Sequence, residues 1–308
     1  MARITLRKKD TVKVDRLFVD SYGIKGDTYY VDSVNGAAGS SGKDPQAPKA
    51  TIEQAYNLCS ANQGDTIVVL PGHVETWSTT TALVLDTAGI EIVGLGRGNS
   101  KPVITVDTIA TKIVDVTAAD IRFTNIRFSA NFADITTLFL LAAAPNFSLD
   151  GCEFVATATN MNWLTIVTTS AVAQAEDGLE MVNCRVVGVD TSDVNVLTIP
   201  EALDGLHFED NYVKMGVNNG NAIIGVTASK AITNAEIVGN RIYRENTSGD
   251  LLIDATGTDH SGIVADNMIG HADTAGEVLI DLDGARMFNN IGTAVTTASG
   301  YVLPAIDS

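Results

Sequence analysis

The chain has 308 residues, of which 45% are hydrophobic and only 6% aromatic, and its formal net charge is −17. So acidic a surface repels nucleic acid and anionic membranes, which excludes both as expected partners. No apolar run approaches the roughly 18 residues of a membrane span, and no apolar signal-peptide segment follows the charged start MARITLRKKD. We therefore expect one main domain, made in a cytoplasm.

Residues 1–27 form a predicted N-terminal arm that concentrates positive charge. Six of the 20 Lys and Arg residues lie within the first sixteen positions: Arg3, Arg7, Lys8, Lys9, Lys13 and Arg16. One interpretation is an anchor that docks on an acidic partner surface, and the other is a solvated tail. Both remain open at this stage.

Residues 28–66 predict a first strand, a Gly/Ser-rich loop and a helix. Thr51 stands at an N-cap position three residues before Gln54, as a capping box requires, and the helix should run to about Asn62. Its apolar face comprises Ile52, Ala55, Tyr56 and Cys59. This face predicts a helix that covers the open end of a repeat structure.

Residues 67–292 contain a repeat with a period near 27. An apolar residue stands three positions before each reference position, and Gly, Asn or Asp stands immediately before it. Because these three residue types tolerate left-handed backbone, we expect a bend there between two short strands. The reference positions are Leu95, Ile126, Cys152, Cys184, Asn211, Asn240, Asn267 and Asn290.

Repeats of this size that are rich in β-branched residues predict an all-β solenoid, here of about 8–9 coils. Stacked coils place Asn211, Asn240, Asn267 and Asn290 one above another, where each amide can bond the next. Cys152 and Cys184 share that column. We expect buried free thiols there rather than a disulfide.

A resemblance supports this fold. The stretches YYVD, ATIEQA and GDTIVVLPGHVE within residues 28–77 resemble the N-terminal segment of right-handed parallel β-helices of the pectate-lyase-like superfamily. The later coils resemble it only in pattern. The superfamily includes polysaccharide-active enzymes, phage tailspikes and other virion proteins. The resemblance implies a right-handed helix strongly and an activity weakly.

Asp254 and Asp281 are the catalytic candidates. Both lie fourteen residues past a reference position, so neighbouring coils should hold them about 4.8 Å apart on an outer face. They could act as a catalytic pair of carboxylates, or they could bind Ca²⁺ as a cofactor. They could also simply be solvated surface groups. The Asn-Thr-Asp, Gly-His-Gly and Arg-x-Pro-x-x-Arg motifs of relatives are absent, and His73, His207 and His271 lack ligand-spaced partners.

The stretch LFLLAAA at 138–144 is apolar on both faces, which is typical of a strand that is buried on both. One explanation is a neighbouring loop that folds over it. We favour a subunit interface through Leu138, Leu140 and Ile166, in a homotrimer of the kind common among viral β-helices. Residues 293–308 lose the repeat and are predicted to form a cap or tail.

These features predict a non-enzymatic phage structural protein in the virion, either a capsid decoration or a tail or fibre component. Its partners would be its own copies and the major capsid or tail protein. Two alternatives remain: a polysaccharide lyase or hydrolase, including a tailspike-type depolymerase, and a non-catalytic glycan-binding adhesion module. A groove with convergent carboxylates and aromatic platforms would favour the enzyme.

Overall fold

The computed structural model describes residues 26–79, 81–108, 112–158, 161–188, 195–215, 222–227, 230–244, 253–255, 259–271, 280–294 and 300–301. The basic residues of the predicted anchor lie outside these ranges. Helix α1 (Ile52–Tyr56) has five residues, and no described helix has the length and apolar character of a membrane span.

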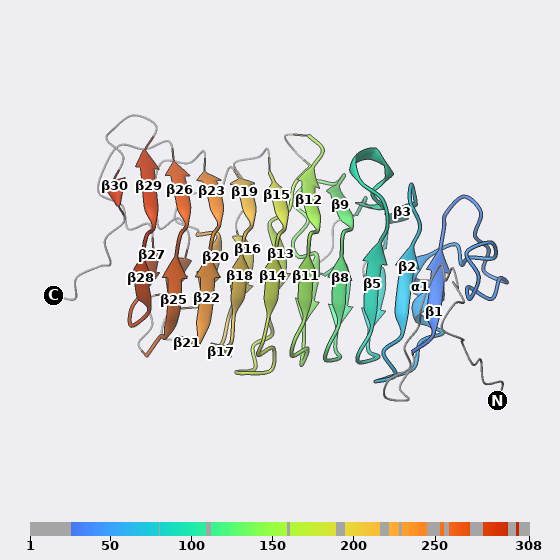
Figure 1. The fold of residues 1–308 in the computed structure, drawn as a ribbon, viewed down its shortest axis with the longest axis horizontal. Helices are drawn as coiled ribbons and strands as arrows, with labels where there is room; N and C mark the ends of the chain where they lie inside the picture. Colours follow the sequence, from blue (N-terminus) through green and yellow to red (C-terminus); the bar gives the residue numbers. More distant parts are fainter. Residues whose placement is uncertain are drawn as a thin grey trace, which may run out of the picture.

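The described chain is a parallel β-solenoid, which confirms the predicted fold class. Successive strands enter three sheets in turn, and each sheet runs the length of the rod (Figure 1). Sheet C takes a strand from each of eight successive coils. Among the strand pairs that the structure describes, the last strand of sheet B runs antiparallel to its neighbour, and it lies within the predicted C-terminal cap.

The sheets have the following bounds. Sheet A contains β1 (Thr28–Val31), β2 (Thr66–Val69), β5 (Glu91–Gly94), β8 (Arg122–Thr124), β11 (Ser148–Asp150), β14 (Glu180–Val182), β18 (His207–Glu209), β22 (Ala235–Val238), β25 (Gly262–Ala265) and β28 (Arg286–Phe288). Sheet B contains β3 (Val74–Trp77), β6 (Val103–Val106), β9 (Arg127–Ala130), β12 (Glu153–Ala156), β15 (Arg185–Val187), β19 (Tyr212–Met215), β23 (Arg241–Arg244), β26 (Met268–His271), β29 (Ile291–Ala294) and β30 (Gly300–Tyr301).

Sheet C contains β4 (Leu83–Leu85), β7 (Val114–Val116), β10 (Phe139–Leu141), β13 (Thr165–Thr168), β16 (Asn195–Ile199), β20 (Ile224–Val226), β24 (Ile253–Ala255) and β27 (Ile280–Leu282). Three short elements lie outside these sheets: the 3-10 helix η1 (Gly98–Ser100) and the paired strands β17 (Leu203–Asp204) and β21 (Ile232–Thr233).

The turn from sheet A to sheet B bends where the repeat predicts. Positive φ angles of 50–71° occur at seven of the eight positions, namely Asn125, Gly151, Asn183, Asp210, Gly239, Asp266 and Asn289. The first coil differs, because Gly94 still belongs to β5 and Leu95 after it is 40% exposed. Short polar residues and glycine accept this left-handed backbone at low cost, which explains their recurrence.

The four asparagines form a buried ladder. The side-chain amides of Asn211, Asn240 and Asn267 each donate to the Oδ1 of the next asparagine, at 3.1, 2.9 and 2.9 Å, and the last acceptor belongs to Asn290. Each amide also donates to a backbone carbonyl of the previous coil, such as that of Phe208 at 2.7 Å. The ladder thereby satisfies polar groups that the solenoid interior removes from water.

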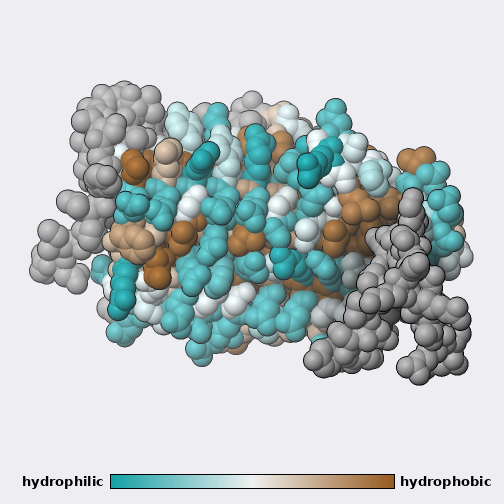
Figure 2. All heavy atoms as spheres, in the orientation of Figure 1, coloured by the Kyte–Doolittle hydropathy of each residue, from teal (hydrophilic) through white to brown (hydrophobic). Residues whose placement is uncertain are grey.

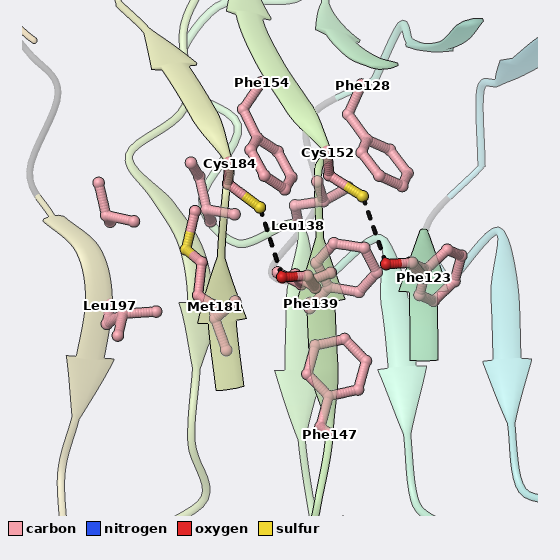
Figure 3. Packing of buried hydrophobic residues seen from close by; sticks show 14 of the residues in the cluster. Phe123, Phe128, Leu138, Phe139, Phe147, Cys152, Phe154, Met181, Cys184 and Leu197 are labelled. Atoms are coloured by element: carbon pink, nitrogen blue, oxygen red, sulfur yellow. Dashed lines mark hydrogen bonds between the residues drawn. The ribbon is translucent and has the colours of Figure 1, made fainter. Parts of the chain in front are cut away.

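Cys152 and Cys184 continue this column as free thiols, and Cys59 is also free. Cys152 donates to the carbonyl of Phe123 at 3.5 Å and Cys184 to that of Leu149 at 3.4 Å (Figure 3). Burial raises the pKa of the Cys184 thiol well above its ordinary value. Both sulfurs are buried in the hydrophobic core, where they serve as small core side chains.

An aromatic cluster fills the core of the central coils. Phe128 stacks on Phe154 with ring centroids 5.4 Å apart, and it meets Phe139 edge-on at 5.4 Å. Phe123 and Phe147 complete the cluster from sheet A and from the turn before it (Figure 3). Phe128 and Phe154 are paired in register on neighbouring coils, so both rings point into the core at the same position.

Helix α1 begins at the predicted cap but ends at Tyr56, not near Asn62. Thr51 Oγ1 accepts from the backbone N–H of Gln54 at 3.2 Å. The helix contacts β1 and β2. Its first residue, Ile52, donates its N–H to the Glu75 carboxylate of the first coil at 3.0 Å, which ties the helix to the rod.

The proposed subunit interface needs correction. Leu138 and Ile166 are fully buried within the single chain, and Leu140 is half-buried. The segments before β10 and β13 pair through Ile135 and Trp163, which belong to the same hydrophobic cluster. Leu138 and Ile166 therefore have no surface to offer a second subunit, and the apolar flank reflects packing inside the chain.

Candidate functional site

The aspartates predicted on sheet C are in register. Asp254 on β24 pairs with Asp281 on β27, as their equivalent positions in the repeat require. Their side chains lie outside the described residues. The site described below is therefore built from other carboxylates, which the register places on the outer face of sheet A.

Strands β18 and β22 bring a histidine and two glutamates together. His207 pairs with Glu236 across the strands, and Glu209 lies two residues along β18, so all three side chains project from the same face. Each offers a nitrogen or oxygen, and the three atoms lie within 4.8 Å of one another. His207 Nε2 is 3.9 Å from Glu236 Oε2.

The two glutamates are electrostatically coupled. The pKa of Glu209 is raised above its usual value, first by partial burial and then by a hydrogen bond to Glu236 and its negative charge. His207 opposes this shift, and Asp210 adds to it. Two carboxylates at this separation cannot both hold a full charge easily, so one of them retains a proton to a higher pH.

Two outward carboxylates of earlier coils, Asp150 and Glu153, have cationic partners. Arg122 donates to Asp150 at 2.6 Å on sheet A. On sheet B, burial alone would raise the pKa of Glu153, but Arg127 and Lys101 outweigh it and hold that pKa below its usual range. Among the described residues, no Lys or Arg forms an ion pair with Glu209 or Glu236. The pKa of Glu209 is thus shifted in the opposite direction from that of Glu153.

Two shallow hollows flank the glutamate pair. One, of about 280 Å³, includes Glu236 in its wall. The other, of about 300 Å³, lies at the turn that follows Glu209. Hydrophilic residues cover most of the face seen in Figure 2, with hydrophobic residues in small separate groups. The hollow beside Glu236 is lined by Asn234, Ala235, Glu236, Gly262, Ile263 and Arg286, and the other by Asp210, Asn211, Tyr212, Gly239 and Arg241.

This cluster was not predicted from the sequence, in which His207 lacks a ligand-spaced partner. A signal was available, because His207 and Glu236 both stand four residues before a reference asparagine and so share one outward column. Glu209 belongs to a second column, two residues further on. Its approach to Glu236 depends on the directions of the side chains, which the repeat does not specify.

Comparisons with known proteins add little beyond the fold. No family model and no curated protein matches the chain. A solved structure titled rhamnogalacturonan lyase is similar over 91% of this chain and 90% of its own, with 12% sequence identity and a TM-score of 0.42. We infer neither a family nor an activity from a likeness at this level.

Proposed function

We propose that the protein cleaves glycosidic bonds in an extended polysaccharide, with Glu209 and Glu236 as the catalytic pair. The supporting observation is the close approach of the two carboxyls on the face of a rod, with the pKa of Glu209 raised. Glycoside hydrolases use two such groups, and their separation sets the stereochemical course. The side-chain oxygens lie within 4.8 Å of each other, which is nearer to the separation of about 5–5.5 Å in retaining enzymes than to the wider gap that an inverting enzyme needs for a water molecule.

In this scheme the two glutamates differ in role. Glu209, which keeps its proton to a higher pH, protonates the oxygen of the leaving sugar. Glu236 attacks the anomeric carbon and forms a glycosyl ester. Glu209 then removes a proton from the incoming water, which breaks the ester and releases the sugar with retention. His207 Nε2 lies 3.9 Å from Glu236 Oε2, beside the attacking carboxylate.

The test compares three single amide substitutions in assays for new reducing ends on a panel of polysaccharides. We expect Glu209→Gln and Glu236→Gln to lower the rate by about 10²–10⁴-fold, the usual range for loss of a positioned acid or base. Glu91→Gln is the matched control, because Glu91 is an exposed outward residue of the same sheet several coils away. It should keep the full rate.

Two results would contradict the proposal. One is the absence of cleavage in every polysaccharide that the protein binds. The other is loss of cleavage in Asp254→Asn or Asp281→Asn while Glu209→Gln remains active, which would move the chemistry to sheet C.

The reaction should depend on pH through Glu209. Its pKa lies above the ordinary 4.5, so the acid form persists above that pH and the rate falls as pH rises through the shifted pKa.

The contribution of Glu209 to folding stability should also fall as pH rises. A group with a raised pKa in the folded state contributes stability that is complete below its unfolded pKa and is lost as pH rises. When Glu209→Gln is unfolded in urea at a series of pH values, its free energy of unfolding should lack this decrease with rising pH.

The virion function stays a prediction. Its anchor residues lie outside the described chain, and two of its three interface residues are buried within the single chain. We propose a test by the mass of the purified protein in solution with and without residues 1–27. A trimer that survives removal of the arm would favour a structural role in a virion.

A further inference from the structure

Three side chains on the outer face of sheet A have the composition of a transition-metal site. His207 and Glu209 come from β18 and Glu236 from β22, two strands that lie side by side in the rod (Figure 1). One imidazole nitrogen and two carboxylate oxygens, one atom from each residue, lie within 4.8 Å of one another. Imidazole suits zinc, copper and nickel ions, whereas Ca²⁺ and Mg²⁺ prefer oxygen ligands. The histidine therefore favours a transition metal.

The three ligand atoms need only a small movement to reach one ion. Zinc binds imidazole nitrogen and carboxylate oxygen at about 2.0–2.2 Å, so ligand atoms at tetrahedral angles lie roughly 3.4 Å from one another. His207 Nε2 and Glu236 Oε2 are already 3.9 Å apart. Their side chains are 46% and 48% exposed, so rotation about the side-chain bonds can close the remaining gap while the strands stay in place.

The surroundings of Glu209 favour a nearby cation. Its paired neighbours on the two adjacent strands are Val182 and Val238, whose side chains have no polar atom. Partial burial, a hydrogen bond to Glu236 and the negative charge of Glu236 raise the pKa of Glu209, so the two carboxylates repel each other when both are ionised. A divalent cation between the two carboxylates replaces that repulsion with attraction.

Two other charged residues share the outward column of His207 and Glu236. Glu180 is paired with His207 on the side away from Glu236, and its carboxylate accepts a hydrogen bond from Ser148 Oγ at 3.1 Å. Arg286 lines the same hollow as Glu236, but its backbone stands two strands further along the column, about 9–10 Å away. Glu180 thus offers a control that has the same charge and the same column but a different contact.

We propose that His207, Glu209 and Glu236 bind a divalent transition-metal ion, with Zn²⁺ as the best match, and that the bound ion inhibits cleavage. Three protein ligands leave the fourth tetrahedral position to water. A glutamate whose oxygens hold a metal ion can neither protonate the leaving sugar nor attack the anomeric carbon. The inhibition rests on the function proposed above, whereas the binding does not.

The first experiment measures Zn²⁺ binding by calorimetry to the full chain, purified without a histidine tag. It is done at about 0.15 M salt, where diffuse attraction of cations to an acidic surface is screened. We expect one strong site for Zn²⁺ that Mg²⁺ does not fill. His207→Gln and Glu236→Gln should each weaken Zn²⁺ binding about 10-fold or more, since even outer-shell partners of metal ligands are worth about 10–100-fold. Glu180→Gln, which removes the same charge from the neighbouring strand β14, should keep the affinity.

Three binding results would overturn the proposal: no heat of Zn²⁺ binding, an affinity that His207→Gln leaves unchanged, or equal weakening by Glu180→Gln and Glu236→Gln. The last result would mean that the ion responds only to total charge. Circular dichroism of each variant checks that the solenoid remains folded, so that a lost site is not mistaken for a lost fold.

The second experiment repeats the assay for new reducing ends with and without Zn²⁺. On a polysaccharide that is cleaved, Zn²⁺ should inhibit the unsubstituted chain, and about 10-fold more Zn²⁺ or a higher excess should be needed to inhibit His207→Gln to the same fraction of its own rate. Zn²⁺ binding without cleavage of any polysaccharide would contradict the proposed hydrolase and leave the metal site standing. Cleavage that continues at full rate with Zn²⁺ bound would overturn the inhibition.

Discussion

Replacing Phe128 with alanine is expected to lower the free energy of unfolding by about 4 kcal/mol, within the range for loss of a large aromatic side chain from a core. Phe128 is fully buried, stacked on Phe154 and in edge contact with Phe139. These neighbours come from different strands of the solenoid and cannot all move into the space. The cost therefore includes a cavity as well as the lost burial.

Urea denaturation followed by circular dichroism measures this change, and Phe132→Ala is the matched control. Phe132 is 37% exposed in the segment that follows β9, so its removal should change stability by no more than about 0.5 kcal/mol. Similar losses in the two variants would show that the central rings are not packed as described. Because solenoids can unfold in parts, the transition should be followed at more than one wavelength.

Replacing Asn240 with alanine is expected to cost about 3 kcal/mol, since buried partners that lose a hydrogen bond each cost roughly 1–3 kcal/mol. Asn240 Oδ1 accepts from both the backbone N–H and the amide of Asn211, at 3.0 and 3.1 Å. Its own amide donates to Phe208 and Asn267. The substitution therefore interrupts the ladder in the middle and leaves donors on one side and acceptors on the other.

The control for the ladder is Asn131→Ala. Asn131 is exposed, and within the described part of the chain its amide makes a single long contact of 3.4 Å to Asp107, so we expect nearly unchanged stability. If Asn240→Ala also left the unfolding midpoint unchanged, the interior amides would have to find other partners or water. The ladder would then be a consequence of the fold rather than a support for it.

The 27-residue repeat predicts most features of the backbone, namely the stacking of the coils and the positions of their bends. Asn211 and Asn240 could be placed one above the other from spacing alone, because each coil must return to the same corner of the core. The left-handed bend at Asp210 follows from the same spacing, since only a few residue types accept that conformation cheaply. The capping box at Thr51 was also visible, although the helix it starts is shorter than its apolar pattern indicated.

The candidate site was less accessible from the sequence. Spacing places His207 beside Glu236, as it places Asp254 beside Asp281, but it assigns no chemistry to either pair. The raised pKa of Glu209 depends on partial burial and on a diagonal approach to Glu236. Both are properties of side-chain direction, which a period of 27 residues does not encode.

The sequence by itself thus determined the solenoid, its turns and its interior column, because stacking imposes one backbone position on every coil. The tertiary structure alone decided which surfaces are available. Leu138 and Ile166 were predicted to lie at a subunit interface, yet both are fully buried within the single chain.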